Sequence, residues 1–209
     1  MVRAFGKKAL DIALLKVDEL LLLAKKQPPE SAIVPHPSLP KGARIIRSVQ
    51  FGDILQGEYS SAASDHGKKC SDTGCRCEDN EPWQSSDGAL YLLTELCDIC
   101  PKEVEKYIPQ VAELATISGF HHANCLKETI YESLPRMFRG VGKSICKMNL
   151  ELFYDGLFRT IKESKHNLLS IAKECIKDIG KFIGPSILKG RLKEYREEYE
   201  KEYEKILNS

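Results

Sequence analysis

The feature that most constrains this chain is a run of helical periodicity that covers its second half. From residue 87 onward, apolar residues recur at intervals of three and four over about 120 residues. This period places them on one face of each of several successive α-helices, and Asp87 is the expected N-cap of the first. Helix breaks are expected at Pro101, Gly119, 140–142, Ser164 and Gly184. The pattern predicts an all-α fold.

Within this region the helices are expected to pair as hairpins, 104–118 with 124–139 and 143–162 with 167–183. When the second helices are aligned, they match at intervals of about 40 residues. The matched positions are Leu96, Leu134 and Ile176, and the last two helices also match at Leu126 and Leu168, Ile130 and Ala172, and Phe138 and Gly180. Because one hairpin cannot bury its own apolar face, neighbours must stack, and the expected architecture is an α-solenoid over 87–187 with an extended curved surface.

Three further segments flank these repeats. Residues 1–26 form an amphipathic helix, and the acidic residues inside it favour packing on neighbours over targeting or membrane-surface binding. Its apolar stripe is Leu10, Leu14, Val17, Leu21 and Ala24. Residues 27–86 hold a proline-rich linker, a short helix near 43–56 and a polar loop that contains cysteines. Residues 188–209 are expected to form one long charged helix that caps the repeats.

Charge and hydropathy argue against two classes of partner. The 31 basic and 30 acidic residues are scattered, so they give no net field to attract nucleic acid. The longest apolar stretch, 20–24, is far shorter than the roughly 20 residues that span a bilayer. Without a recognisable signal peptide, the eight cysteines are interpreted as reduced thiols, and the expected compartment is the cytoplasm, the nucleus or both.

The polar loop offers the one candidate metal site. Cys70, Cys75 and Cys77 lie close together with His66 before them, and zinc prefers four such ligands. The alternative is a loop of oxidisable thiols, because the spacing is unlike a standard zinc knuckle. A zinc-binding module that uses this loop to recognise a partner is therefore the second functional hypothesis, and no other cofactor is expected.

Enzymatic motifs fail on inspection. The string RGVGKS at 139–144 has Met137 where a phosphate-binding loop needs glycine, and it follows a helical pattern instead of a strand. Cys125, Cys146 and Cys175 fall on apolar faces, where they are expected to be core residues. The pair at 121–122 is expected to be solvated in a turn. With no acid–base pair to nominate, we expect a protein that is not an enzyme.

The segment YIPQVAELA, which begins at Tyr107 and has an early Pro109, resembles the first helix of a HEAT repeat, and Leu126 and Lys127 resemble the start of the second. The HEAT/armadillo-like order of loop, helix and hairpins over about 85–184 is similar to the middle of β-type importins. This resemblance implies that the second helices line a concave face that binds protein partners, such as transport cargo or a small GTPase. The candidate partner-binding residues are Lys127, Tyr131, Lys173, Lys177 and Lys181. Lys173, Lys177 and Lys181 recur every four residues and would form a basic ridge, for which the alternative is an ordinary solvated face.

Overall fold

The computed structural model describes residues 2–27, 81–120, 122–164 and 166–208, all within one compact unit. Every regular element among these residues is a helix, which confirms the all-α prediction for this part of the chain. The helix expected near 43–56 and the polar cysteine loop lie outside the described residues.

The helices follow one another with short connections. The elements are α1 (Val2–Leu20), η1 (Leu23–Lys26), α2 (Pro82–Leu96), α3 (Pro101–Val104), η3 (Glu105–Tyr107), α4 (Ile108–Thr116), α5 (Ala123–Val141), α6 (Lys143–Asn149), α7 (Glu151–Glu163), α8 (His166–Ile183), α9 (Pro185–Tyr195) and α10 (Glu197–Leu207), where η marks a 3-10 helix.

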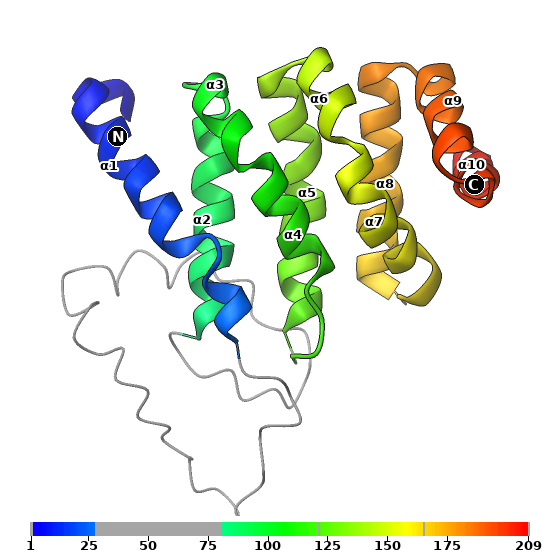
Figure 1. Ribbon diagram of the computed structural model, residues 1–209, viewed down its shortest axis with the longest axis horizontal. Coiled ribbons are helices and arrows are strands. Elements are labelled where there is room, and N and C mark those ends of the chain that lie inside the picture. Colours follow the sequence, from blue (N-terminus) through cyan, green and yellow to red (C-terminus); the bar gives the residue numbers. More distant parts are fainter. Residues whose placement is uncertain (1, 28–80, 121, 165, 209) are drawn as a thin grey trace, which may run out of the picture. The chain divides into compact units, whose positions relative to one another are not determined.

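Two rows of helices pack face to face. Helices α2, α5 and α8 stand side by side in one row, while α1, α4 and α7 lie across them in the other (Figure 1). The core fills the space between the rows, and the matched repeat positions Leu96, Leu134 and Ile176 are all buried in it. The apolar stripes read from the sequence therefore face the core, as expected from their helical spacing.

Glycine and proline set the ends of these helices where the sequence predicts them. Pro101 begins α3, while Gly142 and Gly184 follow α5 and α8 with φ angles of 95° and 107°, a region that side-chain-bearing residues rarely adopt. Because α5 runs to Val141 directly before Gly142, the string RGVGKS spans a turn between helices. A phosphate-binding loop would need a preceding strand.

The start of α2 differs from the prediction. The helix begins at Pro82, and Glu81 with Gln84 forms a capping box that satisfies its first N–H groups. Asp87 therefore lies in the second turn of α2 and is not its N-cap. The sequence pattern underestimated this helix because residues 84–88 are all polar or glycine, and the buried Ser86 takes a position on the apolar face that Trp83 and Leu90 share.

The N-terminal helix packs on its neighbours, as predicted. Val17, Leu21 and Ala24 of its stripe are buried, and α1 contacts α2. The buried hydroxyl of Ser86 accepts from the Ala24 N–H (2.8 Å) and donates to the Leu20 carbonyl (3.0 Å). This single side chain thus satisfies two backbone groups at the end of α1, which a buried helix terminus requires.

The prediction of one long C-terminal helix is wrong. The chain breaks at Arg196, whose backbone is extended (φ −163°, ψ 116°), and α10 folds back against α9 and α8 (Figure 1). Folding back buries Tyr199, Tyr203 and Ile206, which a straight helix would hold in water. Tyr195 stays 40% exposed at the corner. Tertiary burial outweighs local helix propensity here.

Candidate partner-binding face

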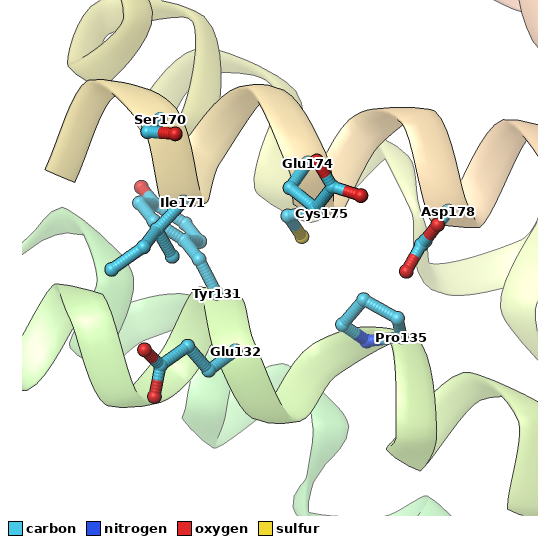
Figure 2. A pocket seen from close by; sticks show the side chains of 8 residues that line it. All are labelled: Tyr131, Glu132, Pro135, Ser170, Ile171, Glu174, Cys175 and Asp178. Atoms are coloured by element: carbon cyan, nitrogen blue, oxygen red, sulfur yellow. The ribbon is translucent and has the colours of Figure 1, made fainter. Parts of the chain in front are cut away.

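A groove of about 350 Å³ lies between α5 and α8 (Figure 2). Pro135, Tyr131 and Cys175 form its inner part, and Figure 2 shows the acidic side chains of Glu132 from α5 and Glu174 from α8 at its sides. Asp178 of α8 adds a third carboxylate. The groove therefore combines an apolar floor with an acidic rim.

Pro135 lies at the groove and inside α5. Proline has no N–H, so the Tyr131 carbonyl one turn earlier loses its helical hydrogen bond. Its ring also needs room that a regular helix does not leave, which makes prolines a recurrent cause of bends in long helices. The proline that interrupts the backbone hydrogen bonding of α5 thus also lines the groove.

The groove floor is tightly packed. Tyr131 is only 1% exposed, and its hydroxyl lies 3.1 Å from Oγ1 of Thr160, which in turn bonds the Gly156 carbonyl at 2.9 Å. Burial raises the pKa of the Tyr131 phenol, so the ring stays neutral. Tyr131 therefore serves the core between α5 and α7 and offers a partner little surface, unlike its predicted role.

The predicted lysine ridge on α8 is not one uniform basic surface. Lys181 is exposed but lies 2.9 Å from the Asp178 carboxylate, and this hydrogen bond raises its pKa. Lys173 and Lys177 are half-buried. Because Glu174 and Asp178 of the same helix line the groove, α8 carries mixed charge there.

Lys127 lies one turn before Tyr131 on α5 and is not among the residues that line the groove. Burial lowers its pKa, nearby Arg159 of α7 lowers it further, and Glu163 of α7 partly restores it. These neighbours place the ammonium beside the C-terminal part of α7. Of the five predicted residues, which lie on α5 and α8, only Tyr131 lines the groove.

The residue that sequence reasoning missed on this face is Arg136. Its guanidinium donates to Glu95 (2.5 and 3.2 Å) and to Asp98 (2.7 Å), so it links α5 to α2, and its hydrogen bond lowers the pKa of Glu95. Arg136, Glu95 and Asp98 are exposed enough for water to screen both ion pairs, so each pair stabilises the fold by about 1 kcal/mol or less. Partners on separate helices leave no sequence signal.

His122 also differs from its prediction. The sequence places it in a solvated turn, but the ring is buried and stacks on the indole of Trp83 at 4.9 Å between centroids, with a 24° interplanar angle. Trp83 lies in the first turn of α2, so this contact joins the N-terminal end of α2 to the N-terminal end of α5. Its partner lies far away in sequence, which is why the turn pattern alone missed it.

Two of the three cysteines predicted to be core residues, Cys146 and Cys175, are buried, whereas Cys125 is only partly buried. Cys97, Cys146 and Cys175 are buried, and burial raises the pKa of Cys97 and Cys146 to about 12. A thiol nucleophile needs a lowered pKa, so these three are poor candidates for thiol chemistry.

This placement predicts an order of alkylation. In the native protein at neutral pH, half-buried Cys100 and Cys125 should react with iodoacetamide before Cys97, Cys146 and Cys175, and urea should abolish the difference. Peptide mass spectrometry over time measures each site. Equal rates at Cys146 and Cys100 in the native protein would contradict the burial of Cys146.

The predicted zinc ligands Cys70, Cys75, Cys77 and His66 lie outside the described residues, and zinc binding there stays a prediction. Within the described ranges, no group of three or more histidine, cysteine or acidic side chains is arranged to hold a metal ion. No helix among these residues is long and apolar enough to cross a membrane.

In comparisons with known proteins, no protein-family model, curated sequence or solved structure matches this chain.

Proposed function

We propose that this chain is a non-enzymatic scaffold of HEAT-like helical repeats, an α-solenoid segment that binds protein partners on the outward face of α2, α5 and α8. Support for the repeat comes from the stacking of α2 on α5 and of α5 on α8, with the equivalent residues Leu96, Leu134 and Ile176 buried in each. A row of equivalent helices presents a continuous surface, which repeat proteins commonly use for binding.

The observation that carries this proposal is the groove between α5 and α8. Its floor includes Pro135 and Cys175, and its rim includes Glu132, Glu174 and Asp178. Concave sites with an apolar lining and a few oriented polar groups are the usual form of a binding site. The groove also lies on the second-helix face that the sequence resemblance assigns to partners.

The sharpest form of the proposal is a transport-receptor-like role, in which the face contacts cargo or a small GTPase in the cytoplasm or nucleus. It rests on the resemblance to β-type importins. In this form, one captured partner is a small GTPase.

The test places a photo-crosslinking amino acid at Glu174 of the groove rim or, as a control, at Glu151 on the other row, and identifies what each position captures. A partner captured only from Glu174 is then purified. We expect Glu174→Lys to weaken its affinity about tenfold, because one charge contact at a rim is commonly worth about 1 kcal/mol or slightly more.

The matched control is Glu151→Lys, which makes the same charge change on exposed α7. It should leave the affinity unchanged. Equal weakening by both variants would reduce the effect to net charge, and no weakening by Glu174→Lys would remove the groove from the binding surface. Calorimetry or fluorescence anisotropy with the purified partner decides between these results.

A further inference from the structure

Helices α9 and α10 are separated by one residue, Arg196, although nothing in the local sequence requires a break. Residues 191–207 contain neither glycine nor proline, and apolar residues continue across the corner with helical spacing. Those residues are Leu188, Leu192, Tyr195, Tyr199, Tyr203 and Ile206. Both halves and the corner itself therefore suit a single helix, and contacts outside the segment must hold the break.

One side chain of α7 makes those contacts. The carboxylate of Asp155 accepts hydrogen bonds from Tyr195 (2.9 Å) and Tyr199 (2.7 Å), and Arg196 lies 3.6 Å away. The Arg196 guanidinium also donates to the Tyr199 hydroxyl at 2.9 Å and lies over its ring at 4.8 Å. A single carboxylate thus holds the residues on both sides of the corner.

Helix α10 packs against α8 and α9 and also contacts α7. The Tyr199 ring stacks on Phe158 of α7 with centroids 4.3 Å apart and a 6° interplanar angle, and Glu198 pairs with Lys162 of α7. Every such partner is also present in a second copy of the chain. Helix α10 can therefore make the same contacts within its own chain or with another.

The fit of α10 in its own chain is incomplete. Tyr203 packs against Gly180 of α8, and its buried hydroxyl has no hydrogen-bond partner among the described residues. A buried unpaired hydroxyl carries a desolvation penalty, which weakens the docked state. The docked α10 thus depends on the Asp155 contacts as well as on apolar burial.

We propose that Arg196 is a hinge latched by Asp155, and that release of the latch joins α9 and α10 into one helix whose α10 part docks on a second copy of this chain. Short hinges between elements that pack well on either copy are the usual basis of domain swapping. The straightened corner regains helical hydrogen bonds, while association costs translational freedom. The latch and the protein concentration therefore set the balance between monomer and swapped dimer.

The test compares Asp155→Asn with Glu151→Gln in the full chain. Glu151 lies one turn earlier on α7 and contacts α9 through Arg191, but it does not touch the corner. We expect Asp155→Asn to raise the dimerisation constant about threefold, because the exposed ion pair between Arg196 and Asp155 forms only at the bent corner, whereas the Tyr199 hydrogen bond can form in the monomer and in the swapped dimer. Size-exclusion chromatography with light scattering, over a range of concentrations, measures it.

A cross-link identifies the swap itself. Equal amounts of unlabelled and ¹⁵N-labelled protein are mixed under conditions that allow exchange, and a carbodiimide then joins Lys162 to Glu198. Mixed-isotope cross-links in the Asp155→Asn dimer are the expected result. A dimer with only same-isotope cross-links would overturn the proposal, as would an Asp155→Asn chain that stays folded and monomeric at every concentration, or an equal rise with Glu151→Gln.

Two further variants test the hinge independently of the Asp155 substitution. Tyr199→Phe keeps the stacked ring and removes a hydrogen bond to Asp155 that docked α10 makes in the monomer and in the swapped dimer alike, so the dimerisation constant should stay nearly unchanged. Arg196→Gly added to Asp155→Asn should lower the dimer constant about fivefold, because glycine disfavours the straight helix. A large rise with Tyr199→Phe, or no fall with Arg196→Gly, would also overturn the hinge.

Discussion

Replacing Phe138 with alanine is expected to lower the free energy of unfolding by about 3–5 kcal/mol. The ring is fully buried between the rows of helices, and it meets Phe153 edge to face, with centroids 5.8 Å apart and an 84° angle. Truncation removes apolar contact area and leaves a cavity that fixed neighbours fill only in part. Urea denaturation followed by circular dichroism at the helical band measures the change.

The control is Met148→Ala, because Met148 of α6 is 70% exposed and loses little on truncation. Its free energy of unfolding should change by less than about 0.5 kcal/mol. Both variants remove a large apolar side chain, so the comparison isolates burial. Similar losses for the two variants would mean that Phe138 does not occupy the core position that the repeat alignment gives it.

The second helices could be predicted from sequence because their information is local. Apolar residues spaced by three and four define the buried faces of α5 and α8, and glycines with positive φ, such as Gly142 and Gly184, mark where the helices stop. Each signal acts within a few residues. Helix positions and the buried register at Leu134 and Ile176 therefore follow without any knowledge of tertiary contacts.

The features that were missed depend on partners far away in the chain. The corner at Arg196 is held by Asp155 of α7, and His122 is buried because Trp83 of α2 covers it. Local propensity predicts a continuous helix in the first case and a solvated turn in the second. No periodicity within either segment carries the contact that decides its structure.

The candidate site illustrates the same limit. The sequence identifies the helices that line the face, and it predicts lysines on α8. It cannot predict the groove, because the groove depends on how Pro135 of α5 meets Cys175 of α8 across an interface. Nor does it reveal the acidic rim, since Glu132 and Glu174 come together only when α5 and α8 pack.

The repeat alignment places Phe138 of α5 over Gly180 of α8, and the structure explains why an aromatic residue and a glycine can be equivalent. Phe138 fills its position with its own ring. At Gly180 the missing side chain leaves the space that the Tyr203 ring of α10 occupies. The C-terminal hairpin thus completes the last repeat with a side chain from outside it.

Gly180→Ala should therefore destabilise the protein even though alanine favours helices. The propensity gain is about 1 kcal/mol, whereas an added methyl in a filled core typically costs about 1–3 kcal/mol. The new Cβ would overlap the Tyr203 hydroxyl and lie 3.1 Å from its Cζ and 3.3 Å from Leu188 Cδ2. A net loss of up to about 2 kcal/mol is expected in urea denaturation.

The sign should change when the obstructing atom is removed. Tyr203→Phe deletes a buried hydroxyl that has no partner among the described residues, so this variant alone should gain about 1 kcal/mol. In the Tyr203→Phe background, Gly180→Ala keeps its propensity gain but meets only the ring edge, and its effect should fall to zero or become stabilising. The double-mutant cycle then gives a coupling of about 1 kcal/mol or more between α8 and α10. Additive effects would mean that Tyr203 does not occupy the space at Gly180, and the account of α10 as the element that completes the last repeat would fail with it.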